Sequence, residues 1–293
     1  MTAISTSSQS RTWVGVVVAL AAAAGYAVAN TSTSVAYQAG SDPMTVAATR
    51  FLVPTVALFV WLRLSGVPLA LPRRDAILGV LLGFVTALYP FALLRAFHVL
   101  PFALAVLIFY LFPLIAAVIA TTLGWEKFNW KIAVAIVLAL VGLALALGVH
   151  GGGNLDVAGI ALSLLAAVGL AVVIVVSSRL FGGGDARPLT LYMAAAATVL
   201  LLILCAVTRD FALPQTPAGW IGFIASSLVY GFAMIAFFIA VSMIGPVRAS
   251  LLSYADAVIS AGLGVVVLGQ TLTMVQVAGI ALVIIALVGA THK

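Results

Sequence analysis

Long apolar stretches alternate with short breaks rich in glycine, proline or charge along the whole chain. An α-helix rises about 1.5 Å per residue, so roughly 20 apolar residues cross the hydrocarbon core of a bilayer. Ten stretches reach this length, at residues 13–37, 43–64, 76–99, 101–123, 131–149, 157–180, 188–207, 218–242, 246–268 and 273–290. The pattern predicts ten transmembrane helices, and the short breaks predict that neighbouring helices run antiparallel.

The composition indicates that the surrounding medium is lipid. Apolar residues make up 65% of the 293 residues, and only 7% are charged, whereas soluble domains carry about 25% charged residues. A chain with so little charge cannot cover its surface for water. We therefore predict an all-α integral membrane protein whose first partner is the lipid bilayer.

The distribution of basic residues predicts the orientation in the membrane. With the N-terminus inside, the cytoplasmic positions hold Arg11, Arg63, Arg73, Arg74, Lys127, Lys131, Arg179, Arg187, Arg248 and Lys293, ten of the thirteen basic residues. Only Arg209 falls in an outside loop. Cytoplasmic loops carry an excess of Lys and Arg, so both termini are expected in the cytoplasm. Because these residues are scattered and not clustered, the net charge of +6 does not indicate a nucleic acid partner.

The two halves of the sequence match weakly at a shift of about 145 residues. The matches are Gly25 with Gly169, Pro101 with Pro246, Leu123-Gly124 with Leu268-Gly269 and, one position out of register, Tyr110 with Tyr254. We predict a polar cytoplasmic tail at 1–12, a first five-helix repeat at 13–150 and a second at 151–293. An odd number of spans in each half inverts the second repeat, an arrangement that places a substrate site near the bilayer midplane.

Three sequence motifs resemble those of the drug/metabolite transporter superfamily. They are Ala92-Leu93-Leu94-Arg95, Tyr110-Leu111-Phe112-Pro113, and Leu123-Gly124-Trp125-Glu126 leading to Trp130. In the second half, Ser253-Tyr254, Val258 and the Gly269 turn occupy the corresponding places. The chain is similar to the EamA branch, and within it to the YddG-type exporters of aromatic and neutral amino acids. This resemblance covers nearly the whole chain and implies a ten-helix transporter of the bacterial inner membrane.

The sequence also departs from that family. Gly25-Tyr26 replaces a tryptophan-glycine pair of the first span, and Ala257 replaces a proline of span nine. Both changes fall where a pore would be lined. The substrate of any one family member therefore cannot be transferred to this chain.

Asp256 is the first candidate for chemistry because it lies near the centre of the span at 246–268. An ionised carboxylate there costs roughly 2.5–3.5 kcal/mol on insertion scales. Ser253 and Ser260 share its helical face, while Tyr254 lies about 160° away around the axis. Two interpretations remain open: the carboxyl group binds a substrate ammonium or titrates during transport, or it hydrogen-bonds a neighbouring helix.

Arg50 lies about eight residues inside span two, and Arg95 lies about four residues from the outer end of span three. Either guanidinium could hold a substrate carboxylate through a bidentate contact. The alternative is structural, because a long arginine side chain can reach the headgroups or pair with a residue such as Asp42.

Aromatic and hydroxyl side chains supply the remaining candidates. Tyr230, Met234 and Phe237 recur at i, i+4 and i+7, which defines one stripe of a helix, although such a stripe is also common in ordinary packing. The predicted substrate-binding set is Asp256, Tyr254, Ser253, Tyr110, Tyr89, Tyr230, Asn30, Tyr26, Met234, Phe237, Arg95 and Arg50. Such a cavity would be wide, largely apolar and aromatic, which suits neutral or hydrophobic amino acids.

The leading hypothesis is a secondary transporter that exports amino acids or related metabolites by alternating access, with or without proton coupling through Asp256. Other small metabolites, nucleosides and cationic drugs remain alternative substrates. The glycine runs at Gly151 and Gly182 lack the Lys-Ser or Lys-Thr of a phosphate-binding loop, and the three histidines lie far apart in the sequence. We therefore expect no cofactor, no metal and no enzyme activity; an intramembrane enzyme or a membrane scaffold is the remote alternative.

Overall fold

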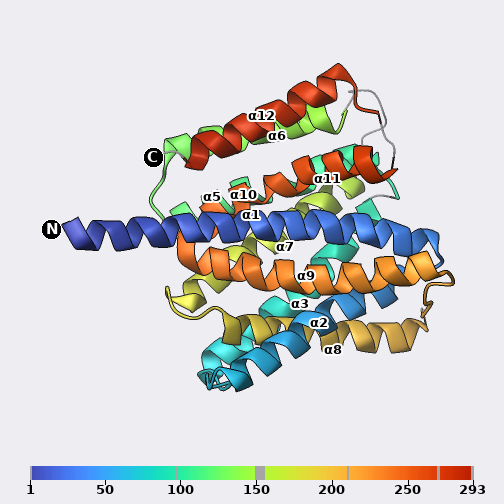
Figure 1. The fold of residues 1–293 in the computed structure, drawn as a ribbon, viewed down its shortest axis with the longest axis horizontal. Helices are drawn as coiled ribbons and strands as arrows, with labels where there is room; N and C mark the ends of the chain where they lie inside the picture. The colour runs from blue at the N-terminus through green and yellow to red at the C-terminus, as the bar shows by residue number, and fades with distance from the viewer. Residues whose placement is uncertain (1, 97, 149–155, 210, 269–270, 292–293) are drawn as a thin grey trace.

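The computed structural model describes residues 2–96, 98–148, 156–209, 211–268 and 271–291 and is all α-helical over these ranges. Its helices form one bundle (Figure 1). They are α1 (Thr2–Gln38), α2 (Pro43–Leu64), α3 (Arg73–Ala96), α4 (Phe102–Phe109), α5 (Phe112–Thr122), α6 (Trp130–Ala146), α7 (Val157–Phe181), α8 (Arg187–Thr208), α9 (Pro217–Ile244), α10 (Pro246–Leu252), α11 (Tyr254–Leu268) and α12 (Met274–Thr291).

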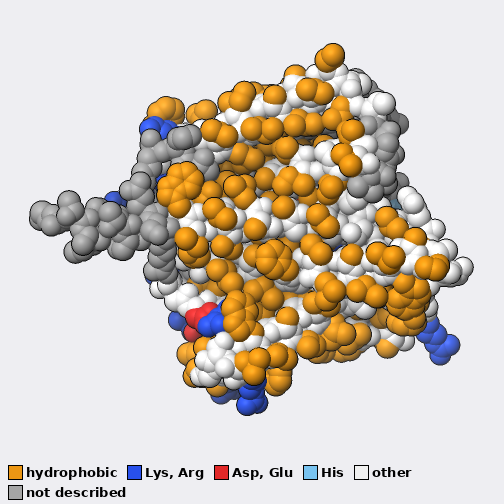
Figure 2. Space-filling model, in the orientation of Figure 1, with side chains coloured by type: hydrophobic (Ala, Val, Ile, Leu, Met, Phe, Trp, Pro, Cys, Tyr) orange, Lys and Arg blue, Asp and Glu red, His pale blue; other side chains and the backbone are white. Residues whose placement is uncertain are grey.

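Eight segments of the described chain are long and apolar enough to cross a membrane, and α4 with α5 and α10 with α11 each count as one of them. Two further apolar helices, α6 and α12, are shorter. The outer face shown in Figure 2 is largely hydrophobic, with Lys and Arg side chains near its edges. The prediction of an all-helical membrane protein is confirmed, while a full count of ten spans stays a prediction.

The ends of the chain differ partly from expectation. The segment at 2–12, predicted as a tail, is continuous with α1, which extends past the rest of the bundle. The start of α1 and the end of α12 lie on the same side of the bundle (Figure 1). The predicted boundary at 150/151, the Gly151–Asn154 connection and the Gly269–Gln270 turn lie outside the described residues.

Several helices begin at a side chain that caps their first backbone amides. Asp42 Oδ2 accepts hydrogen bonds from the amides of Met44 and Thr45 at the start of α2, and Asp156 does the same at the start of α7. Capping satisfies donors that a helix leaves free at its N-terminus. Asp42 is thus engaged in a cap and does not pair with Arg50.

Two spans that were predicted as continuous helices, 101–123 and 246–268, are each interrupted in the structure. The first is interrupted at Tyr110 and Leu111, between α4 and α5, because Pro113 has no amide hydrogen and its ring crowds the preceding turn. The second is interrupted at Ser253, between α10 and α11, although its only proline, Pro246, lies at the start of α10 and not at the break. Here Ser253 Oγ donates to the Ala249 carbonyl at 3.2 Å, a back-bond that bends helices.

The helices pack in matched pairs across the two halves of the chain. α1 lies against α9, and their counterparts α7 and α3 also pack together. α11 contacts α1, just as α4 and α5 contact α7. α2 pairs with α8 and α6 with α12, so each of these helices packs on its own counterpart. The contact pattern is therefore that of two related repeats.

Small residues allow these helices to approach closely. A Cβ added to Gly142 of α6 would lie 2.7 Å from the Gly279 carbonyl oxygen of α12, and one added to Gly279 would lie 2.5 Å from the Ala146 amide. Alanine is the most frequent residue of the buried core, and many large apolar side chains, such as Trp13 and Val266, are exposed on the outer surface. Lipid solvates apolar side chains, so close packing between helices, which small residues allow, contributes strongly to holding the bundle together.

Glu126 links the two repeats at the connection between α5 and α6. Its carboxyl group lies against Gly245 and near the Val247 backbone amide at the start of α10. Burial raises the pKa of the Glu126 carboxyl, while the Val247 amide and the charge of Arg248 act in the opposite direction. The folded protein therefore favours the protonated acid more than the unfolded chain does.

This raised pKa predicts a pH-dependent effect of Glu126→Gln. A carboxyl group with a raised folded pKa contributes stability at low pH that is lost as the pH rises through that pKa. The glutamine variant has no carboxyl group and does not lose stability in this way. The difference in melting temperature, variant minus wild type, should therefore increase from pH 4 to pH 8. Thermal melts of the detergent-solubilised proteins measure this difference, and a difference that falls with pH would contradict the prediction. Asp75→Asn, at the start of α3, is the matched control.

Candidate substrate cavity

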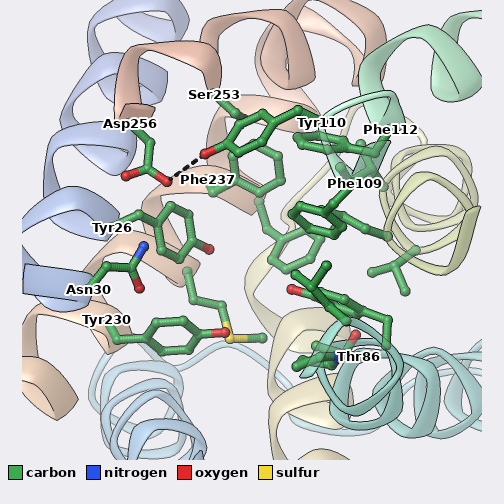
Figure 3. Close-up of a pocket in the computed structure, with 18 of the residues that line it drawn as sticks. Tyr26, Asn30, Thr86, Phe109, Tyr110, Phe112, Tyr230, Phe237, Ser253 and Asp256 are labelled. Atoms are coloured by element: carbon green, nitrogen blue, oxygen red, sulfur yellow. Dashed lines mark hydrogen bonds between the residues drawn. The ribbon is translucent and has the colours of Figure 1, made fainter. Parts of the chain in front are cut away.

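A cavity of about 260 Å³ lies where the two interrupted helices meet the walls formed by α1, α3, α7 and α9. Ten of the twelve predicted site residues line it, namely Tyr26, Asn30, Arg50, Tyr89, Tyr110, Tyr230, Met234, Phe237, Ser253 and Asp256. Figure 3 shows most of these side chains around the space they enclose. Residues spread over the whole sequence are thus brought together, and their contact with a substrate stays a prediction.

Asp256 stands in the first turn of α11 with two hydroxyl partners. Tyr110 donates its phenolic O–H to Asp256 Oδ2 at 3.3 Å (Figure 3), and Ser260 donates to Oδ1 at 3.1 Å. The bond from Ser260 agrees with the predicted shared helical face. Ser253, also predicted on that face, lines the cavity, but its hydroxyl is engaged with Ala249. In the described part of the chain, Asp256 has no cationic partner within ion-pair distance.

The two helix interruptions are joined directly. Tyr254 donates to the Tyr110 carbonyl oxygen at 2.7 Å, and the two rings stack with centroids 5.6 Å apart. The same Tyr110 side chain reaches Asp256 on the other side. A carbonyl released by the break between α4 and α5 is therefore satisfied from the break between α10 and α11, which removes the cost of leaving it unpaired.

Arg50 occupies a polar cluster between α1, α2 and α9. Its Nε donates to Ser226 Oγ at 3.0 Å, and its Nη2 donates to the Ala29 carbonyl at 2.9 Å, to Thr33 Oγ1 and, at 3.4 Å, to Asn30 Oδ1. The guanidinium also lies 5.0 Å from the centre of the Tyr230 ring, a cation–π distance. The side chain therefore points into the protein and is not used to reach the headgroups.

Aromatic rings form most of the remaining wall. Tyr230 packs edge-on against Tyr26, with centroids 5.5 Å apart, and Tyr89 stacks on Phe109 at 6.0 Å. Phe237 contacts Tyr26 in turn. The stripe predicted from Tyr230, Met234 and Phe237 does face the cavity.

Two predicted residues lie elsewhere. Tyr254 is fully buried behind Tyr110 and does not line the cavity, and Arg95 is exposed at the end of α3. The geometry of this cavity therefore gives no support to a substrate contact by either side chain.

The sequence reasoning also missed part of the lining. The missed residues are Thr86, Pro90, Leu93, Phe109, Phe112, Leu170, Val173, Ile174 and Phe238. Phe109 and Phe112 flank Tyr110 closely in the sequence and could have been included on that ground. Leu170, Val173 and Ile174 follow the same i, i+3, i+4 spacing as any packed helix face, so the sequence held no signal for them.

Comparisons with known proteins agree with this architecture. The structure is similar to a crystal structure described only as that of a protein, with a TM-score of 0.80 and 22% identity, covering 94% of this chain and 96% of that one. At this identity the likeness shows the fold alone. A comparison with curated proteins gives no match. The model of the EamA-like transporter family matches residues 13–148 and again 157–291. Since these two matches account for most of the sequence, the chain belongs to the EamA-like transporter family of the drug/metabolite transporter superfamily and is a multi-pass membrane protein.

Proposed function

We propose that this protein is a secondary transporter of the bacterial inner membrane that exports neutral or aromatic amino acids and related small metabolites. The observation that carries the proposal is the central cavity between the two interrupted helices. It combines aromatic walls with one carboxylate, Asp256, and one guanidinium, Arg50. A mostly apolar pocket with a small number of convergent polar groups is typical of small-molecule sites.

The helix interruptions support transport through this cavity. Transporters built from inverted repeats commonly bind substrate at the midplane, beside helices that are discontinuous there. In this chain the interruptions lie at Tyr110–Leu111 and Ser253. Alternating access would arise as one repeat tilts against the other around the cavity, with both termini in the cytoplasm.

The size and charge of the cavity distinguish among substrate classes. A volume of about 260 Å³ lies just below the range of pockets for drug-sized molecules, which is roughly 300–1,000 Å³. This favours a single amino acid over a drug-sized compound. Arg50 in the wall also disfavours a purely cationic drug, because an approaching cation would meet an unpaired positive charge.

Counterflow in proteoliposomes tests the proposal. Liposomes containing the purified full-length protein are loaded with unlabelled L-phenylalanine, and entry of labelled L-phenylalanine is compared with that in protein-free liposomes. We expect accumulation only with the protein, inhibited by other neutral amino acids. Absence of flux for all twenty amino acids, nucleosides and cationic drugs would refute a transporter function for this cavity.

Labelling of single introduced cysteines from each side tests the proposed orientation.

A further inference from the structure

The two charged groups of the cavity lie at separate places in its wall. Asp256 belongs to α11, whereas Arg50 is placed by its contacts with Asn30 and Tyr230. In Figure 3 the Tyr26 ring lies between Asp256 on one side and Asn30 and Tyr230 on the other. Both groups line the same cavity, yet they form no ion pair with each other or with any other residue that the structure describes.

Arg50 keeps hydrogen-bonding capacity for a ligand. Its Nε and Nη2 are engaged by α1 and α9, but Nη1 makes no hydrogen bond with any described residue. A guanidinium held from behind in this way is fixed in position before a ligand arrives. Its free N–H groups match a carboxylate, the anion that arginine binds with the best geometry.

The Asp256 carboxylate is complementary in charge to the ammonium group of a substrate. Its two oxygens each accept one hydroxyl hydrogen bond, and a carboxylate has further lone pairs that an ammonium group can occupy. A cavity with unlike charges at two ends and rings between them therefore suits a molecule that carries both charges and an apolar side chain.

We propose that the cavity recognises zwitterionic α-amino acids at both ends, with the substrate carboxylate on Arg50 Nη1 and the substrate ammonium on Asp256. The substrate side chain then lies against the aromatic wall that includes Tyr89 and Phe109. This inference rests on the proposed transport function and specifies which substrate group each charged residue holds. Each end contributes a charge-assisted hydrogen bond, so removal of either substrate charge should weaken binding about tenfold to a hundredfold.

A competition experiment on the wild-type protein tests the inference. Counterflow of labelled L-phenylalanine is measured against unlabelled L-phenylalanine, phenethylamine, which lacks the carboxylate, and 3-phenylpropionate, which lacks the ammonium. We expect L-phenylalanine to compete at least tenfold better than either analogue. Equal competition by one analogue, with flux intact, overturns the two-ended recognition and leaves the transport function standing. Absence of flux for every solute of the broader panel overturns both.

Variants of Arg50 and Asp256 test which charged group of the substrate each residue holds. Arg50→Gln should remove the preference for L-phenylalanine over phenethylamine, and Asp256→Asn should remove the preference over 3-phenylpropionate. Arg95→Gln, a guanidinium outside the lining, should leave both preferences unchanged. Since Arg50 also contacts α1 and α9, Arg50→Lys is included to retain the positive charge if the glutamine variant does not fold. Unchanged preferences in a folded Arg50→Gln or Asp256→Asn protein would contradict the assignment, and the wild-type competition decides the matter without any variant.

Discussion

Replacing Asp256 with asparagine is expected to lower the rate of amino-acid counterflow at least about tenfold without unfolding the protein. Asparagine has nearly the same shape; its carbonyl oxygen can accept from one of the two hydroxyls of Tyr110 and Ser260, and its amide N–H can donate to the oxygen of the other, so the helix junction should survive. The substitution removes the negative charge that attracts an ammonium group or carries a proton, an interaction worth about tenfold to a hundredfold. Counterflow in proteoliposomes and thermal melting of the same preparation measure the two effects separately.

Asp75→Asn provides the matched control for Asp256→Asn. Asp75 lies in the first turn of α3 and does not line the cavity, so its loss should leave counterflow unchanged. Normal flux and an unchanged pH dependence in the Asp256→Asn protein would reduce Asp256 to a structural residue. Loss of flux together with a collapsed melting transition would likewise speak for a structural role of its carboxylate.

Substituting alanine for Gly83 is expected to destabilise the bundle by about 1–3 kcal/mol, the usual cost of overpacking a tight interface. Gly83 lies in α3 against α8, where an added Cβ would overlap the Met193 carbonyl oxygen and approach the Ala196 Cβ to 2.7 Å. The atom in the way belongs to the backbone, so a side-chain rotation cannot relieve the clash. The free energy of unfolding in detergent, or the melting temperature, measures the effect.

Gly262→Ala separates the effect of crowding from that of glycine itself. Gly262 lies in α11, and an added Cβ there meets no atom within 4 Å. Alanine should be neutral or stabilising by up to about 1 kcal/mol at this position because it favours the helix. If both alanine variants melt at the same temperature, α3 and α8 can move apart at no cost, and close backbone contact does not hold this interface.

Much of the architecture was predictable because the bilayer restricts the choices so strongly. A chain with 65% apolar residues and apolar stretches of about 20 residues has few options other than membrane-spanning helices. Charged residues inside a membrane span are costly, so the positions of Asp256 and Arg50 within apolar stretches were enough to mark them as candidates. Both line one cavity, as do the tyrosines named with them, except Tyr254.

The differences between the sequence-based expectations and the structure have physical causes that lie outside local sequence patterns. Hydropathy is the same for a continuous span and for one interrupted at its centre, so the break at Ser253 was not visible. Tyr254 belongs to the Ser253-Tyr254 motif, but its side chain faces Tyr110 and does not line the cavity. Arg95 stands at the end of α3, where the helix places it on the surface.

The sequence by itself determined the solvent, the helical class and the duplicated organisation, because these follow from composition, the length of apolar runs and recurring residues. Only the tertiary structure decided that Arg50 is held by Ser226 and Ala29, and that Tyr110, Tyr254 and Asp256 join the two interruptions. These contacts join residues up to 176 positions apart. They depend on which faces of distant helices meet, and this is set by close packing of small residues, which hydropathy does not encode.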